Sequence, residues 1–173
     1  FRDRPAHNRK REHDVCKGQE KIAMYTLHKE LVVETAREKA WAFIRNPANL
    51  NRITPDDMDF AIVGDLPAEM YEGMLVEYRV KLPLIGKQTW VSELKHIRPM
   101  ESFVDEQKIG PYRFWYHYHG IEEAENGVKL VDHVSYQPPC GPVGMLANAL
   151  FIRNNLERIF AFREHAFQSI LAS

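Results

Sequence analysis

The sequence predicts an α+β protein in which a curved antiparallel sheet of about seven strands wraps around one long C-terminal helix. Three observations support this fold class. Alternating segments rich in β-formers follow a first short helical segment, with Gly and Pro between them. No helix separates these later strands, which favours antiparallel pairing over a parallel βαβ sheet. From Val143 onward, apolar residues recur at helical spacing and no Gly or Pro follows Gly144.

The composition is that of a globular protein with one domain. The chain has 173 residues, of which 45% are hydrophobic and 27% charged, a length typical of a single domain. Its uncharged stretches are much shorter than the roughly 20 apolar residues of a membrane-spanning helix. A formal net charge of −1 provides no basic field for nucleic acid. Cys16 and Cys140 are far apart, which argues against a disulfide framework and favours a reducing, cytoplasmic location.

Residues 1–22 differ from the rest of the chain. They contain seven Lys and Arg against four Asp and Glu, so this leader has a net charge of +3 while the remainder has −4. Apolar residues are scarce, and no apolar stretch typical of a secretory signal is present, so we expect a basic, flexible extension. The single folded domain is predicted to span residues 23–173.

The first elements of the domain are a strand and one or two short helices. Met24–Glu34 alternates and is rich in β-formers, which predicts a strand. Thr35 followed by Glu38 has the spacing of a capping box and predicts that a helix begins there. That helix should end before Asn46-Pro47, because proline disfavours helical geometry in the residue before it. Asn49–Ile53 can form one further short turn.

Six further strands are predicted between breakers, over Asp59–Val63, Leu75–Leu82, Thr89–Ile97, Ser102–Gln107, Arg113–Glu123 and Val128–Gln137. The Asn126-Gly127 pair between the last two strands predicts a two-residue hairpin turn. In that register Glu125 pairs with Val128, and His119 lies opposite Val134.

This hairpin register divides the two strands into an inward and an outward face. We expect the inward face to hold Trp115, His117, His119, Ile121, Asp132, Val134 and Tyr136. The outward face, with Phe114, Tyr116 and Tyr118, should contact solvent. Half-buried polar groups need partners or a ligand, and His119 and Asp132 are placed to reach each other diagonally across neighbouring strands.

The other strands and the long helix should add side chains to the same space. Alternation predicts that Tyr78, Trp90, Phe103 and Asp105 also point inward. Arg153 and Arg163 lie close to the apolar stripe of the helix, so a guanidinium could reach a cavity acid or a ligand carboxylate. The predicted ligand-binding residues are Tyr78, Trp90, Phe103, Asp105, Trp115, His117, His119, Tyr136, Arg153 and Arg163.

Several segments resemble the START/polyketide-cyclase superfamily, whose helix-grip fold includes the pollen-allergen-like proteins. These segments are Trp41–Leu50, Ile53–Pro55, Phe103–Gln107, Gly110-Pro111 and Trp115–His119. The resemblance covers residues 24–172 and is to a bacterial branch described as ligand-binding or cyclase/dehydrase-like. It implies a sheet that grips the C-terminal helix around an internal cavity. Because this superfamily includes binders, transfer proteins and enzymes, the fold leaves the chemistry open.

Three functions remain open. The leading hypothesis is the binding or carriage of a small hydrophobic molecule, such as a lipid, polyketide or isoprenoid-like compound, in the internal cavity. The second is a cyclase/dehydrase-type enzyme in which His119 moves a proton, Asp132 orients the imidazole, and Arg163 or Tyr136 binds the oxyanion. The third is a protein-interaction module with a vestigial cavity, which an exposed apolar patch on the outer sheet face would favour.

The sequence does not predict a metal ion or another cofactor. His117-Tyr118-His119 places two imidazoles on one strand face and Glu123 lies further along it, as in the HxH…E pattern of cupins. The later part of the chain is helical and offers no third His at the matching position. No GxGxxG, P-loop or GxSxG motif follows a strand. The expected partner is a small hydrophobic ligand, without nucleic acid or integral membrane association, in a monomer or homodimer.

Overall fold

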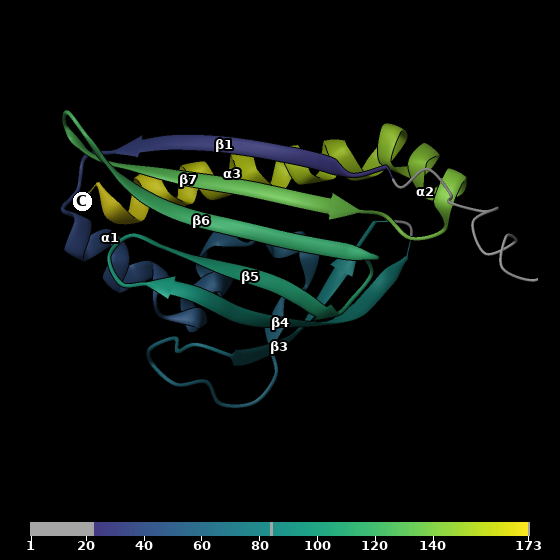
Figure 1. Ribbon diagram of the computed structural model, residues 1–173, viewed down its shortest axis with the longest axis horizontal. Coiled ribbons are helices and arrows are strands. Elements are labelled where there is room, and N and C mark those ends of the chain that lie inside the picture. Colours follow the sequence, from purple (N-terminus) through teal and green to yellow (C-terminus); the bar gives the residue numbers. More distant parts are fainter. Residues whose placement is uncertain (1–22, 84, 173) are drawn as a thin grey trace, which may run out of the picture.

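A seven-stranded antiparallel sheet forms the centre of the structure (Figure 1), a computed structural model that describes residues 23–83 and 85–172. The strand order is β1-β7-β6-β5-β4-β3-β2, so the first strand pairs with the last and the other neighbours are consecutive. The predicted α+β class is confirmed. The strands are β1 (Tyr25–Val33), β2 (Ala61–Ile62), β3 (Met74–Leu82), β4 (Gly86–Arg98), β5 (Ser102–Ile109), β6 (Phe114–Ala124) and β7 (Gly127–Gln137).

Helices follow β1 and β7. Figure 1 shows the long helix running along the sheet beside β1 and β7, with the short helix α1 near the end where the chain terminates. The predicted C-terminal helix is confirmed, although it starts slightly earlier and contains a π-helical segment. The helical elements are α1 (Arg37–Ile44), the 3₁₀ turns η1 (Pro47–Ile53) and η2 (Asp56–Met58), α2 (Gly141–Ala147), the π segment η3 (Asn148–Ile152) and α3 (Arg153–Leu171).

Two predictions about local structure are wrong. Thr35 does not cap α1: the N-cap is Ala36, and the buried Thr35 hydroxyl has no hydrogen-bond partner among the described residues. Because Glu38 is then only the second helical residue, the spacing of a capping box is lost. The predicted strand Asp59–Val63 is reduced to β2, a two-residue edge strand. The chain turns immediately before it, since Asp59 has a left-handed φ of 43°.

The β6–β7 hairpin has the predicted faces but a different register. Its turn consists of Glu125 and Asn126, and Gly127 is the first residue of β7. The predicted Asn-Gly turn requires a positive φ at both of its central residues, whereas of these three residues only Gly127 has one, 126°. The pairing therefore shifts by two residues, which keeps each side chain on its face and places His119 directly opposite Asp132.

The hydrophobic core lies between the sheet and α3. Four side chains at helical spacing are buried along this helix, namely Leu156, Phe160, Phe167 and Leu171. They pack into two clusters with inward side chains of the strands, including Val76, Leu94 and Val134. The opposite sheet face exposes Phe114 and Tyr118, as predicted.

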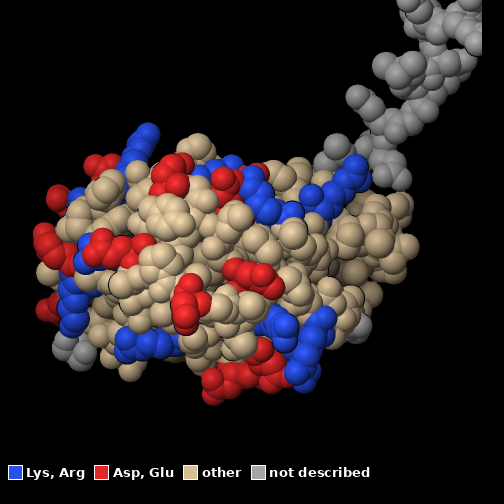
Figure 2. Space-filling view, turned by 90° about the horizontal axis from the view of Figure 1, so that it is seen from below, with Lys and Arg blue, Asp and Glu red and all other residues tan. Residues whose placement is uncertain are grey.

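The surface combines mixed charge with one apolar end. Figure 2 shows Lys, Arg, Asp and Glu interspersed over the face seen from below, and few of them around α2. At that end α2 and η3 expose Val143, Met145, Leu146, Leu150 and Phe151. Within residues 23–83 and 85–172, none of the helices has both the length and the apolar character that crossing a membrane requires. The predicted basic leader, residues 1–22, lies outside the described residues.

Candidate functional site

An internal cavity of about 180 Å³ lies between the sheet, the helical segments that follow β1, and α3. Most of its lining is apolar or aromatic, as illustrated by Phe43, Val76, Trp90, Leu94 and Phe167. The polar side chains of the lining include one connected group, formed by Ser92, Asp105, His117, His119, Asp132 and Arg163. The cavity predicted between the sheet and the long helix is therefore present.

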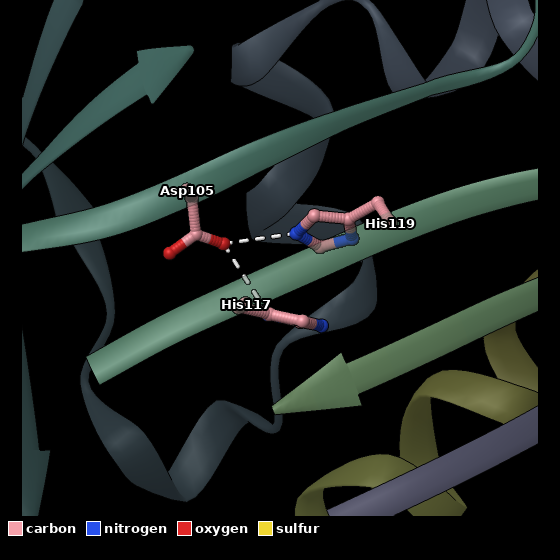
Figure 3. A group of neighbouring side chains, drawn as sticks. All are labelled: Asp105, His117 and His119. Atoms are coloured by element: carbon pink, nitrogen blue, oxygen red, sulfur yellow. Dashed lines mark hydrogen bonds and ion pairs between the residues drawn. The ribbon is translucent and has the colours of Figure 1, made fainter. Parts of the chain in front are cut away.

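Two imidazoles bridge two carboxylates on the cavity wall. His117 and His119 project from β6, Asp105 from the neighbouring β5 and Asp132 from the neighbouring β7. On the β5 side (Figure 3), Asp105 Oδ2 lies 3.3 Å from His117 Nδ1 and 2.9 Å from His119 Nε2. On the β7 side, Asp132 Oδ1 lies 2.7 Å from His117 Nε2 and 3.2 Å from His119 Nδ1. Every nitrogen of the two rings thus faces a carboxylate oxygen.

Aromatic rings and one arginine enclose this group. The rings of His117 and His119 are tilted by 35° to each other with their centroids 3.7 Å apart, and Phe103 stacks on His119 at 4.3 Å. On α3, Phe160 meets His117 at an angle, with ring centroids 5.5 Å apart. Arg163 Nη1 approaches Asp132 Oδ1 at 3.7 Å, but the buried Arg163 Nε has no hydrogen-bond partner in the described part of the chain. Arg163 therefore retains a donor that a cavity ligand could use.

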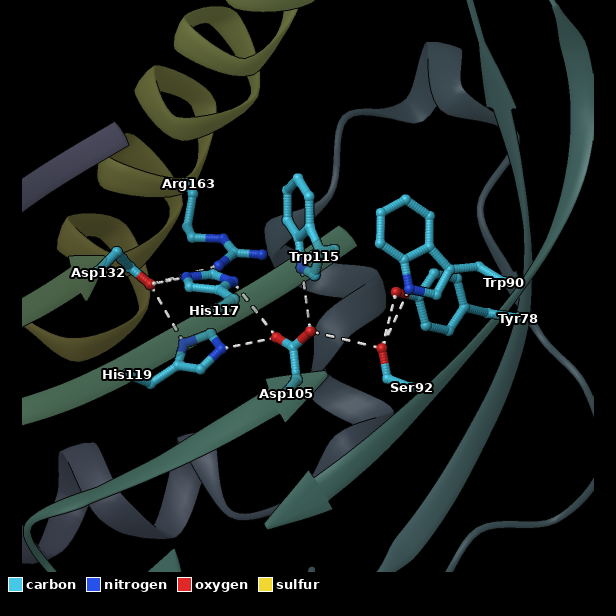
Figure 4. Close-up of polar contacts among 9 residues, drawn as sticks. All are labelled: Tyr78, Trp90, Ser92, Asp105, Trp115, His117, His119, Asp132 and Arg163. Carbon is cyan, nitrogen blue, oxygen red and sulfur yellow. Dashed lines mark hydrogen bonds and ion pairs between the residues drawn. The ribbon is translucent and has the colours of Figure 1, made fainter. Parts of the chain in front are cut away.

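A second set of hydrogen bonds extends from Asp105 along the aromatic wall of the cavity (Figure 4). Asp105 Oδ1 accepts from Trp115 Nε1 at 3.3 Å and from the Ser92 hydroxyl at 3.4 Å. Ser92 Oγ accepts from Trp90 Nε1 at 3.1 Å and lies 3.4 Å from the Tyr78 hydroxyl. The two indoles are therefore held in orientation by their N–H groups, while their rings supply apolar cavity surface.

Contacts within the polar group keep the carboxylates of Asp105 and Asp132 ionised. Burial by itself would raise the pKa of Asp105 and of Asp132, but hydrogen bonds from His117 and His119 outweigh burial and hold both pKa values well below the ordinary range. Burial would likewise lower the pKa of His117, yet its hydrogen bonds to the two carboxylates raise that pKa above the ordinary value. The pKa of the Tyr78 hydroxyl is raised well above 10.0, first by burial and then by the charge of Asp105. The site therefore contains fixed negative charges and a neutral phenol.

Most of the predicted site residues surround this cavity. Eight of the ten predicted ligand-binding residues line it, and so does Asp132, the predicted partner of His119; these eight are Tyr78, Trp90, Phe103, Asp105, Trp115, His117, His119 and Arg163. Their contact with a ligand stays a prediction.

The other two predicted ligand-binding residues, Tyr136 and Arg153, lie outside the cavity lining of the described chain. Tyr136 is buried, and its hydroxyl donates to Asn148 Oδ1 at 2.8 Å, so it holds the sheet against η3. Arg153 is exposed at the start of α3. Ten residues separate it from Arg163, which places the two side chains about 80° apart around the helix axis.

Sequence reasoning missed two features of the site. Ser92 was not selected, although it lies between the inward residues Trp90 and Leu94 and the period-2 alternation would have identified it. The pairing of Asp105 with both histidines was also missed. It depends on the β5–β6 register, and the connection between these strands carries no two-residue turn from which that register could be derived.

Comparison with known proteins finds similarity in structure only. No protein-family model and no curated protein matches the sequence. The di-domain ARO/CYC StfQ from the steffimycin biosynthetic pathway is similar with a TM-score of 0.65 and 11% identity, over 86% of this chain and 51% of that one. Protein CV1439 from Chromobacterium violaceum has a TM-score of 0.62 and 12% identity, over 86% and 98% of the two chains. For Ara h 8.0201 the TM-score is 0.55 and the identity 12%, over 85% and 99%.

Likeness at such low identity establishes the fold. The antiparallel sheet closed around the C-terminal helix is the helix-grip fold, which confirms the resemblance drawn from the sequence at the level of structure. The protein is therefore a helix-grip protein with an internal cavity. Because this fold hosts unrelated activities, the function must be argued from the cavity itself.

Proposed function

We propose that this protein binds a small, largely apolar molecule whose polar end lies against Arg163 and the His–Asp group. The observation that carries the proposal is the arrangement of the cavity wall, which is mostly apolar and aromatic and holds its charged side chains in one connected polar group. Arg163 has a buried Nε without a hydrogen-bond partner among the described residues. Arg163 lines the cavity, so a carbonyl or carboxylate oxygen of the ligand would accept a hydrogen bond from its guanidinium group.

The size of the cavity limits which molecules could bind in it. A dry cavity of about 150 Å³ lined by apolar side chains is large enough for benzene, and the cavity here measures about 180 Å³. A compound with one or two rings, or a chain of medium length, fits this space better than a lipid with two long acyl chains. The likeness to StfQ, an ARO/CYC protein, is compatible with an aromatic or polyketide-like ligand.

A titration with 2-naphthoate, a fluorescent two-ring probe with a carboxylate end, tests the proposal. We expect saturable binding to the wild-type protein and at least about tenfold weaker binding to Arg163→Gln, because the variant loses a buried charged donor. Arg153→Gln is the matched control, since Arg153 is exposed on the same helix and should leave the affinity unchanged. Circular dichroism verifies that both variants are folded.

Native mass spectrometry of freshly purified protein complements the titration. A molecule that stays with the protein would identify the ligand directly. The proposal fails if the wild-type protein is free of ligand and also shows no saturable probe binding. Equal weakening in the two arginine variants would instead indicate general attraction of the anion to a basic helix.

A second candidate is proton transfer in a cyclase/dehydrase-type reaction. It is favoured by His119, which lines the cavity, is 17% exposed against 3% for His117, and contacts both carboxylates. Tyr136 cannot serve this reaction as an oxyanion donor, because its hydroxyl already donates to Asn148. His119→Gln should abolish turnover of a poly-β-keto substrate while probe binding persists. Unchanged turnover would exclude this candidate.

A further inference from the structure

We propose that His117 Nδ1, His119 Nε2 and Asp105 Oδ2 form a binding site for one divalent transition-metal ion, such as Zn²⁺ or Fe²⁺. The ligand atoms that the three side chains offer lie within 4.8 Å of one another. Figure 3 shows both imidazoles directed at the same carboxylate oxygen. This ion site goes beyond the binding of an apolar molecule and does not depend on it.

The distances between these atoms are those of ligands around one ion. At metal–ligand distances of about 2.0–2.1 Å, neighbouring ligand atoms are about 2.9 to 3.4 Å apart, depending on the coordination angle. Asp105 Oδ2 lies 2.9 Å from His119 Nε2 and 3.3 Å from His117 Nδ1. Two imidazoles and one carboxylate are a ligand set suited to Zn²⁺ and Fe²⁺, and a set of three leaves coordination positions open.

Asp132 supplies the outer contacts that orient metal-bound histidines. Its Oδ1 lies 2.7 Å from His117 Nε2 and 3.2 Å from His119 Nδ1, the two ring nitrogens that face away from Asp105. With the ion bound, each ring would donate an N–H to Asp132, as His117 Nε2 already does, and its other nitrogen would be free to bind the ion. Arg163, 3.7 Å from the same oxygen, balances part of its charge.

The competing explanation of this geometry is a pair of protonated histidines. The structure has a hydrogen bond from each ring, His117 Nε2 to Asp132 and His119 Nε2 to Asp105; a neutral imidazole donates from only one nitrogen, so a hydrogen bond at each of the other two contacts would require both rings to be protonated. Two cationic rings would then lie with their centroids 3.7 Å apart beside Arg163. A divalent ion carries the same two positive charges as the two added protons, but it leaves both rings neutral and places the charge between the ligand atoms. Metal binding itself distinguishes the two explanations.

The position of the three ligands makes the ion accessible. Asp105, His117 and His119 all line the cavity, so the open coordination positions face the space assigned to the ligand. Water or an oxygen atom of a bound molecule could occupy these positions. A metal ion there would also place positive charge beside the polar end of that molecule.

The test uses the full chain after treatment with EDTA and removal of the chelator. In isothermal titration with Zn²⁺ we expect one ion per chain with a dissociation constant of about 1 μM or tighter. Asp105→Asn and His119→Ala should each weaken binding at least about tenfold. The matched control is His133→Ala, which removes an exposed histidine from the outer face of β7 and should leave the affinity unchanged.

Two results would overturn the ion site. One is the absence of Zn²⁺ binding by the wild-type protein at concentrations up to about 1 mM. The other is binding that Asp105→Asn leaves unchanged or that His133→Ala weakens equally. If the ligand variants do not fold, NMR spectra of the wild-type protein with Co²⁺ decide: paramagnetically shifted ring protons of His117 and His119 support the site, and unshifted ring protons contradict it. Probe titration of the metal-free protein tests the proposed function separately.

Discussion

The carboxylate of Asp132 serves three side chains at once, which makes Asp132→Asn a direct test of the buried network. His117, His119 and Arg163 approach it at 2.7, 3.2 and 3.7 Å, and its side chain is only 14% exposed. An asparagine of the same shape can keep a carbonyl oxygen at the position of Oδ1, to which all three contacts run, but it removes the negative charge that these donors share. Breaking one partner of a buried ion pair costs about 3–5 kcal/mol, a large part of the roughly 5–15 kcal/mol that stabilises a typical domain.

Urea unfolding followed by circular dichroism near pH 7 measures this cost, with EDTA present so that metal ions do not contribute. A loss of that size should lower the melting temperature by about 6–20 °C in a chain of this length. Asp57→Asn is the matched control, because Asp57 pairs with Arg158 at 3.0 Å on the surface, where the side chains are 67% and 45% exposed. It should cost less than about 1 kcal/mol. A loss for Asp132→Asn no larger than that of the control would refute the reasoning.

Three other substitutions test the packing, the hairpin and a surface carboxylate. Phe160→Ala should lower the free energy of unfolding by about 3–5 kcal/mol, because it removes a buried ring from the cavity wall; a loss under about 1 kcal/mol in urea would show that the helix closes the gap. Gly127→Ala should lower the melting temperature, since its φ is 126° and a Cβ would clash with the Val33 carbonyl oxygen; an unchanged melt would mean that the turn relaxes at no cost. Glu72→Gln should destabilise the protein near pH 7, because the backbone N–H groups of Ile97 and His96 hold the Glu72 pKa below 4.5. Because the folded pKa of Glu72 lies below its unfolded value, its carboxylate stabilises the protein above the unfolded pKa, and this contribution is lost as the pH falls through the folded pKa. The melting temperatures of the two proteins should therefore converge as the pH falls below 4.5, and a constant difference across pH would contradict this origin.

The order of strands and helices was predictable because it depends on local sequence. The alternation of Tyr78, Val80 and Leu82 indicates a half-buried strand whatever its neighbours are. The apolar stripe of α3 likewise indicates a long helix with one buried face. Capping at Thr35 was not predictable in the same way, since a shift of the helix start by one residue removes the hydrogen-bond geometry.

The β6–β7 hairpin shows which features the local sequence does not specify. The sequence assigned Asp132 to the inward face, and the structure agrees, because a two-residue shift of register preserves the faces. The same shift changes the residue opposite His119 from an apolar one to Asp132. The two registers differ at Asn126, which lacks the positive φ that the predicted turn requires, and composition alone does not specify this backbone angle.

By itself, the sequence determined the α+β class, the long C-terminal helix and the inward direction of Asp105, His117 and His119, since side-chain direction in a strand depends only on the residue's place in the alternation. The tertiary structure decided which of these groups touch. Asp105 and Asp132 reach the same two rings only because β5 and β7 flank β6 in register, and Arg163 rather than Arg153 faces them because of the rotation of α3. Such distances are set by pairing between strands and by helix docking, and contacts between residues far apart in the chain are not encoded in any local pattern.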